Sequence, residues 1–167
     1  EYMWDARPEF WKRTSPVLFP IVGGLHEGKY YYEGQEYAMS QHGFARDMEF
    51  TLTEQTQESL RFELNDTAET YAKYPFHFKL LITYKIVDNH LKITWKVDNT
   101  NDHKMYFSIG GHPAFLCPIQ EKTKQTDYTL RFDTADRIIS SVLGEGGLLT
   151  NEKKTYALDN GVLAVTK

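Results

Sequence analysis

The sequence predicts an all-β fold in which antiparallel strands pack as a large sandwich. Two observations support this prediction: apolar and polar residues alternate over much of residues 50–109, and polar turns separate the alternating runs. Aromatic residues make up 14% of the 167 residues, and Tyr and Phe favour strands. We expect a single domain over residues 1–167, because this length can bury a core of its own.

The first forty residues predict short extended elements. Pro8 predicts the start of a short helical turn. Residues 16–22 form an apolar run that contains two prolines, which predicts an edge strand or a buried extended segment. Residues 30–32 and 36–38 flank Gly34-Gln35 and predict a hairpin.

Residues 50–109 predict a series of strands, interrupted by one helix. The helix is expected over Asp66–Lys73, with Asp66 as the N-cap and an end near Pro75. After Phe132 the alternation is lost, and we expect charged turns as far as Lys167. The apolar residues expected on the inner faces of the strands are Phe50, Leu52, Leu60, Phe62, Leu64, Phe76, Phe78, Leu80, Ile82, Tyr84, Ile86, Leu91, Ile93, Trp95, Val97, Met105, Phe107 and Ile109.

Composition excludes several classes of partner. The net charge of -4 argues against nucleic acid, because binding phosphates needs a basic face. No apolar run is long enough to span a membrane, so we expect no membrane partner. The single cysteine, Cys117, excludes an internal disulfide and predicts a reducing compartment, hence a cytoplasmic location.

Both ends of the sequence predict that the natural chain is longer. Glu1 is not an initiating Met, and residues 160–163 resemble the interior of a domain. Half of a β-sandwich would expose an open edge and an apolar face, which proteins normally cover. We therefore expect the fold to be incomplete at its C-terminal end, with further strands after Lys167 or supplied in another way.

The most distinctive segment presents a histidine at the end of an apolar run. Residues 105–109 alternate, Gly110-Gly111 follow, and His112 stands before Pro113. The glycines permit close backbone approaches, and Pro113 biases His112 toward an extended conformation. This arrangement is typical of a site histidine. The alternative is a buried turn histidine that bonds a backbone carbonyl.

The other histidines differ in their surroundings. His42 lies in a polar loop over residues 41–47, directly before Gly43. We expect His77, His90 and His103 to face solvent, whereas the sequence leaves His26 open. No histidine pair has the spacing of metal ligands, and no serine-nucleophile or phosphate-loop motif occurs, so we expect no metal and no cofactor.

Three segments in order resemble the aldose 1-epimerase (galactose mutarotase) family, in its LacX-like branch. They are residues 16–23 (PVLFPIVG), residues 41–46 (QHGFAR) and residues 110–115 (GGHPAF). The resemblance implies a β-supersandwich that interconverts the α and β anomers of a free hexose or hexose phosphate. It also implies that His112 protonates the ring oxygen, that His42 contacts the sugar near the same oxygen, and that Arg46 contacts a hydroxyl or phosphate.

This reaction needs an acid and a base on opposite sides of one C–O bond. The resemblance therefore implies that the two imidazoles converge on one site wide enough for a pyranose. High aromatic content agrees with sugar binding, because flat rings stack on pyranose faces. For Arg46, an ion pair with Asp47 or Glu49 is the structural alternative.

Two departures from the family pattern leave alternatives open. Many members have an arginine where this chain has Gly24, so its grip on the substrate is expected to differ. The family's catalytic glutamate lies in a late strand, and none of Glu49, Glu54, Glu63 or Glu145 stands in a matching motif. The alternatives are a non-catalytic carbohydrate-binding or regulatory protein on the same fold, and a β-sandwich interaction module with structural histidines.

Overall fold

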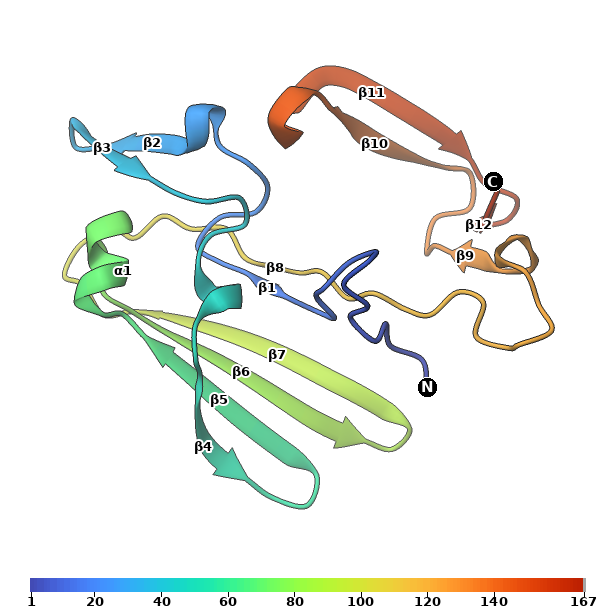
Figure 1. The fold of residues 1–167 in the computed structure, drawn as a ribbon, viewed down its shortest axis with the longest axis horizontal. Coiled ribbons are helices and arrows are strands. Elements are labelled where there is room, and N and C mark those ends of the chain that lie inside the picture. The colour runs from blue at the N-terminus through green and yellow to red at the C-terminus, as the bar shows by residue number, and fades with distance from the viewer. Residues whose placement is uncertain (167) are drawn as a thin grey trace. The chain divides into compact units, whose positions relative to one another are not determined.

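A computed structural model describes residues 1–166 and consists mostly of strands (Figure 1). The all-β prediction is therefore confirmed. The chain divides into two compact units: Val17–Gly110, and Glu1–Pro16 together with the chain from Gly111 onward. The expectation of a single domain stays a prediction.

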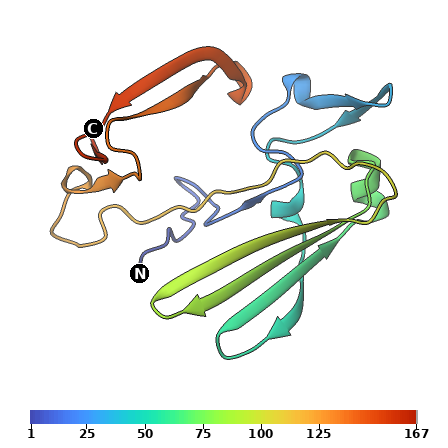
Figure 2. The same ribbon diagram turned by 180° about the vertical axis from the view of Figure 1, so that it is seen from behind.

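The unit Val17–Gly110 is built on a four-stranded antiparallel sheet, visible from both sides in Figures 1 and 2. Its strand order is β4-β5-β6-β7, so each strand pairs with its neighbour in sequence. The alternation over residues 50–99 predicted these strands correctly. They are β4 (Thr51–Gln55), β5 (Ser59–Asn65), β6 (Phe78–Val87) and β7 (His90–Asn99).

The register places the predicted apolar residues on one face of this sheet. Leu80 pairs with Leu64 on one side and with Val97 on the other, and Ile82 pairs with Phe62 and Trp95. The end of the face that carries Leu80 is buried, with Leu80 fully inaccessible to solvent. The residues that share the core with it are Phe19, Met39, Ala45, Leu64, Tyr74, Phe76, Phe78 and Ile82.

The opposite end of the same face is exposed. Ile86 is 54% exposed and Leu91 is 61% exposed, although both continue the apolar rows of β6 and β7. The prediction of one apolar face is therefore confirmed, and only part of that face is buried. The core elements of residues 17–110 extend over only part of the sheet.

A hairpin and a short strand complete this unit. The predicted hairpin joins β2 (Lys29–Tyr32) to β3 (Gln35–Ala38). Its turn is Glu33-Gly34, both with positive φ, and not Gly34-Gln35 as predicted, because Gln35 already belongs to β3. The apolar run before it forms β1 (Val17–Leu18) and then Phe19, which is fully buried. The short 3-10 helices η1 (His26–Gly28) and η2 (Ala45–Asp47) lie in the connecting loops.

The one α-helix of residues 1–166 is α1 (Ala68–Lys73), and its N-cap differs from the prediction. Thr67, not Asp66, caps it: the Thr70 amide donates to Thr67 Oγ1 at 3.2 Å, and the Thr67 amide donates to Thr70 Oγ1 at 2.8 Å. Asp66 instead accepts from the Phe78 amide at 3.1 Å and pairs with His77 Nδ1. The helix ends before Pro75, as predicted.

Residues 105–109 were predicted as a strand, but they form an extended segment outside the sheets. Ser108 donates its backbone N–H to the Pro20 carbonyl, and Met105 and Ile109 pack against the core. The strand β8 (Gly110–Gly111) begins directly after this segment. The division between the two units falls within β8. Apolar alternation therefore predicted a strand here, although residues 105–109 belong to no sheet.

The second unit contains more strand than the sequence predicted. Its strands are β9 (Thr129–Arg131), β10 (Arg137–Leu143), β11 (Leu149–Ala157) and β12 (Val162–Ala164), and its 3-10 helices are η3 (Gln125–Asp127) and η4 (Glu145–Gly147). β10 pairs with β11 in the orange-red hairpin of Figure 1, and β9 pairs with β12, both antiparallel. The prediction of charged turns after Phe132 is therefore wrong.

The capping box at Thr67 gives a stability prediction. We expect Thr67→Ala to lower the free energy of unfolding by about 1 kcal/mol, because the Thr70 amide loses the hydroxyl to which it donates. Thr67→Ser keeps a hydroxyl and should stay close to wild type. Urea unfolding followed by circular dichroism measures both, and equal stability of the two variants would contradict the assignment.

Candidate functional site

The loop that carries His42 runs over residues 40–47, between β3 and the end of η2, and we call it the His42 loop. His42 has φ +66° and Gly43 has φ +71°, so two successive residues adopt the left-handed conformation. Glycine adopts this backbone conformation readily, and among the other residues it is commonest for Asn, Asp and His. The sequence at this turn is therefore compatible with its backbone at both positions.

Gly43 allows the loop to lie directly against the buried apolar run. The Phe44 and Ala45 amides both donate to the Phe19 carbonyl oxygen, at 3.1 and 3.2 Å. A Cβ at position 43 would overlap that carbonyl and approach Pro20 Cδ to 2.7 Å. Ser40 closes the loop from the other side by donating its hydroxyl to the Gly43 carbonyl at 3.0 Å.

His42 is held by two hydrogen bonds to one residue, Gly23. The Gly23 amide donates to His42 Nδ1 at 2.9 Å, and the His42 amide donates to the Gly23 carbonyl at 2.9 Å. The imidazole is half-buried. Its orientation is thus fixed by the backbone of the segment that follows β1.

Arg46 lies in η2 and contacts its own loop. Its Nη2 donates to the Gln41 carbonyl at 2.6 Å, and its Nε lies 3.6 Å from Asp47 Oδ2. The ion pair with Asp47 that the sequence left open is therefore present. The contact of Arg46 with a sugar stays a prediction.

His112 belongs to the other unit, where it is exposed and lies beside one N-terminal aromatic residue, Trp11. Its ring centroid is 5.0 Å from that of Trp11, with the planes tilted by 43°. Its amide donates to the Pro16 carbonyl at 3.2 Å, and Trp4 Nε1 donates to the Trp11 carbonyl at 2.7 Å. The structure therefore gives His112 an aromatic neighbour. Its predicted convergence with His42 stays a prediction.

The remaining histidines lie outside these loops. His77 and His103 are exposed and pair with Asp66 and Asp102, at 2.7 and 2.9 Å. His90 is the exposed first residue of β7, and His26 is exposed in η1. Within residues 1–166, no group of three or more His, Cys, Asp or Glu side chains is arranged to hold a metal ion.

Two of the glutamates considered in the sequence are held in ion pairs. Glu63 accepts from Asn65 Nδ2 at 2.8 Å and lies 3.4 Å from Lys79 Nζ. The Asn65 hydrogen bond, followed by the Lys79 charge, lowers the pKa of Glu63. Glu54 pairs with Arg61 at 2.8 Å. A general base needs a carboxyl whose pKa is raised, so the shift at Glu63 has the opposite direction.

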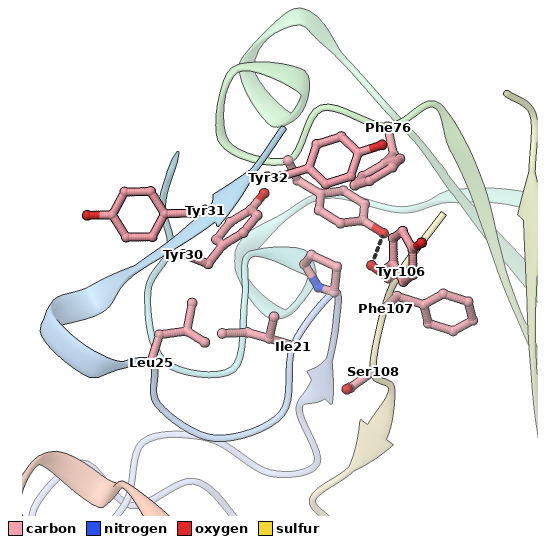
Figure 3. Close-up of a pocket in the computed structure, with 11 residues that line it drawn as sticks. Ile21, Leu25, Tyr30, Tyr31, Tyr32, Phe76, Tyr106, Phe107 and Ser108 are labelled. Carbon is pink, nitrogen blue, oxygen red and sulfur yellow. Dashed lines mark hydrogen bonds between the residues drawn. The ribbon is translucent and has the colours of Figure 1, made fainter. Parts of the chain in front are cut away.

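An aromatic pocket of about 350 Å³, which we call the tyrosine pocket, lies within the unit Val17–Gly110 (Figure 3). Its volume falls within the range typical of small-molecule sites. Neither His42 nor Arg46 is among its lining residues. These are Pro20, Ile21, Leu25, Tyr30, Tyr31, Tyr32, Tyr74, Phe76, Tyr106, Phe107 and Ser108.

Two phenol groups connect the walls of the tyrosine pocket. Tyr30 donates its hydroxyl to the Lys73 carbonyl at 2.9 Å, and Tyr74 donates to the Tyr106 carbonyl at 2.8 Å, the dashed line in Figure 3. Burial raises the pKa of Tyr30 to about 12 and also raises the pKa of Tyr74. Both groups are therefore neutral donors at physiological pH.

The sequence profile of the aldose 1-epimerase family matches residues 1–145. This range contains the His42 loop, Arg46 and His112. The chain belongs to the aldose 1-epimerase family. The family resemblance stated from the three sequence motifs is therefore confirmed.

Two curated relatives of this family are similar to the chain along nearly all of its length. The plasmid and chromosomal LacX proteins of Lactococcus lactis subsp. lactis are 36% and 35% identical to it over 167 residues. Each alignment covers 96% of this chain and 56% of the relative. The chain thus spans about half the length of the curated relatives it matches.

Solved structures agree with this assignment. A galactose mutarotase related enzyme from Lactobacillus acidophilus has a TM-score of 0.91 at 36% identity, covering 99% of this chain and 55% of that one. A galactose mutarotase-like protein from Lactobacillus casei ATCC 334 has a TM-score of 0.84 at 30% identity, covering 99% and 57%. The predicted galactose mutarotase-like fold is thus confirmed.

Sequence reasoning found the loops of this aldose 1-epimerase family member but missed several neighbours of the site residues. Gly23 contacts His42 through its main-chain amide. A glycine at this position indicates that the chain can turn there, but it gives no signal for the contact itself. For Trp11, the sequence shows only an aromatic residue far from His112 in the chain, so it gives no signal for the contact between the two rings. For the tyrosine pocket, the sequence indicated only a high aromatic content, without showing which of these residues lie together.

The close approach at Gly43 gives a prediction with a matched control. We expect Gly43→Ala to destabilise the protein by more than about 3 kcal/mol, because strain at φ +71° adds to overlap with the Phe19 carbonyl. Gly34→Ala has a similar φ of +79° and nothing within 4 Å, so it should cost only about 1–2 kcal/mol. Urea unfolding compares them, and equal losses would contradict the overlap.

Tyr74 gives a pH-dependent prediction. Its pKa is raised in the folded state, so its contribution to stability is present below pH 10 and is lost as pH rises beyond that value. Tyr74→Phe should lower stability at neutral pH by about 1 kcal/mol, because the Tyr106 carbonyl loses its donor. It should also reduce the loss of stability above pH 10. Unfolding curves at neutral and alkaline pH measure this, with exposed Tyr2→Phe as the control.

Proposed function

We propose that the protein interconverts the α and β anomers of a free hexose or hexose phosphate. The observation that carries this proposal is the family match over residues 1–145, which spans the loops of His42, Arg46 and His112. A solved structure similar to the chain is described as a galactose mutarotase related enzyme. Its description favours an isomerase acting on a sugar.

The proposed reaction is ring opening by general acid–base catalysis. A base removes the proton from the anomeric hydroxyl. The oxygen of this hydroxyl then forms the aldehyde carbonyl with C1, while the bond between C1 and the ring oxygen breaks. An acid delivers a proton to that ring oxygen. The aldehyde then rotates, and the former ring oxygen attacks the other face of its carbon. The two proton transfers run in reverse, which gives the second anomer.

His112 is proposed as the acid that protonates the ring oxygen. The imidazole packs beside Trp11 and its backbone is held by the Pro16 carbonyl, so its position is defined within its own unit. His42 and Arg46 are proposed as contacts to the sugar, with Arg46 suited to a hydroxyl or a phosphate. The base is not assigned to any residue of this chain.

A second candidate function is sugar binding without catalysis. Gly24 stands where many family members have an arginine, and none of Glu49, Glu54, Glu63 or Glu145 stands in a motif that matches the family's catalytic base. Under either function the proposed partner is a small sugar and no nucleic acid or membrane. Within residues 1–166, no helix is long and apolar enough to cross a membrane. A cytoplasmic location stays a prediction from the single cysteine.

Polarimetry separates the two functions. Freshly dissolved α-galactose or α-glucose relaxes toward its anomeric equilibrium, and we expect the protein to accelerate this relaxation. His112→Ala should remove most of the acceleration, because one acid–base group typically contributes about 10²–10⁴-fold. Unchanged relaxation together with measurable sugar binding would select the non-catalytic function.

The matched control for this experiment is His90→Ala. His90 is exposed at the start of β7 and lies in no family motif, so its removal should leave the rate unchanged. An active His112→Ala variant would show that His112 is not the acid. Loss of activity in both variants would point to a general loss of folded protein, which circular dichroism detects.

A further inference from the structure

The contact between Gly23 and His42 defines where the imidazole carries its proton. The Gly23 amide nitrogen lies 2.9 Å from His42 Nδ1, in the geometry of a hydrogen bond. A backbone N–H can only donate, so Nδ1 must present a lone pair. In a neutral imidazole the proton then resides on Nε2. We propose that Gly23 fixes His42 as the Nε2–H tautomer, which makes His42 a hydrogen-bond donor toward the sugar and not a proton acceptor.

The surroundings of this contact oppose any alternative orientation of the ring. A second bond, from the His42 amide to the Gly23 carbonyl, holds the two residues together. The positive φ of Gly43 and the hydrogen bonds from the Phe44 and Ala45 amides to the Phe19 carbonyl hold the loop on its other side. Turning the ring over would place a carbon against the Gly23 N–H, and leaving a partly buried donor without an acceptor is unfavourable.

The consequence for chemistry rests on the proposed function. An Nε2–H group can bond a lone pair of the ring oxygen or of a hydroxyl, and so orients and polarises the C1–O bond that breaks. It cannot take up the proton of the anomeric hydroxyl, because it has no lone pair available on that side. His42 is therefore a substrate-orienting donor, Gly23 is its positioning residue, and the base must be a different group.

Nuclear magnetic resonance tests the tautomer directly, without any sugar. In protein labelled with ¹⁵N-histidine, a long-range nitrogen–proton correlation spectrum distinguishes protonated from unprotonated ring nitrogens. His42→Asn identifies the His42 signals among those of the six histidines by their disappearance. At neutral pH we expect Nε2 to be protonated and Nδ1 to be unprotonated. A protonated Nδ1, or a rapid average of both tautomers, would overturn the assignment.

Two substitutions separate the two nitrogens of His42. His42→Asn places an amide oxygen near Nδ1 and tolerates φ +66°, so it should keep the bond from Gly23 and unfold near wild type. It does not reach the position of Nε2, and we expect it to bind galactose about 3- to 10-fold more weakly. His42→Gln reaches that position with an N–H donor and should retain more galactose binding, although it should be the less stable variant.

The outcomes keep this inference distinct from the proposed function. If His42→Asn binds galactose as tightly as wild type, His42 is structural only and the inferred donor role is wrong. If wild-type protein neither binds galactose nor accelerates its mutarotation, the proposed function fails, and with it the role toward sugar. The tautomer assignment is then judged by the nitrogen spectrum alone.

Discussion

The hydrogen bonds to the Phe19 carbonyl connect the core of one unit to its candidate functional loop. Phe19 is fully buried, and its ring contacts those of Phe44, Tyr74 and Phe78. The oxygen of the same residue accepts the amides of Phe44 and Ala45. This close approach requires the absence of a side chain at Gly43. The position of the His42 loop is therefore determined by packing in the core as well as by its own turn.

The two candidate histidines are held by different kinds of interaction. His42 is held by main-chain groups of Gly23, which define both the direction of the ring and its tautomer. The His112 amide donates to the Pro16 carbonyl, and the His112 ring packs against that of Trp11. A group that gives up and recovers a proton needs both protonation states, whereas an orienting donor needs only one. The contact with Gly23 therefore suits the orienting role proposed for His42.

The sequence predicted most of the unit Val17–Gly110 because its strands have one buried and one exposed face. Strands β4 to β7 follow a period of two, and turn residues separate them. The hairpin β10–β11 was missed because most of its side chains are exposed, so backbone pairing rather than apolar alternation defines it. Asp66 was predicted as the N-cap from residue type, but its carboxylate bonds the Phe78 amide and His77 instead.

The candidate site was predictable to the extent that it consists of motif residues. His42, Arg46 and His112 were identified from their loops and the family resemblance, and their roles stay predictions. The Gly23 amide and the Trp11 ring were not predictable, because a main-chain donor is independent of residue type and Trp11 lies 101 positions from His112 in the sequence. Contacts of this kind depend on the tertiary arrangement.

The hydroxyl bonds across the tyrosine pocket also affect how this unit reaches its folded state. Tyr30 and Lys73 are 43 residues apart, and Tyr74 and Tyr106 are 32 residues apart. Each bond closes a long loop, whose entropic cost must be met before the contact can contribute. Such non-local contacts raise the contact order, which correlates with slow folding in small domains. The walls of the pocket are therefore expected to form late, after the sequential hairpins of β4 to β7.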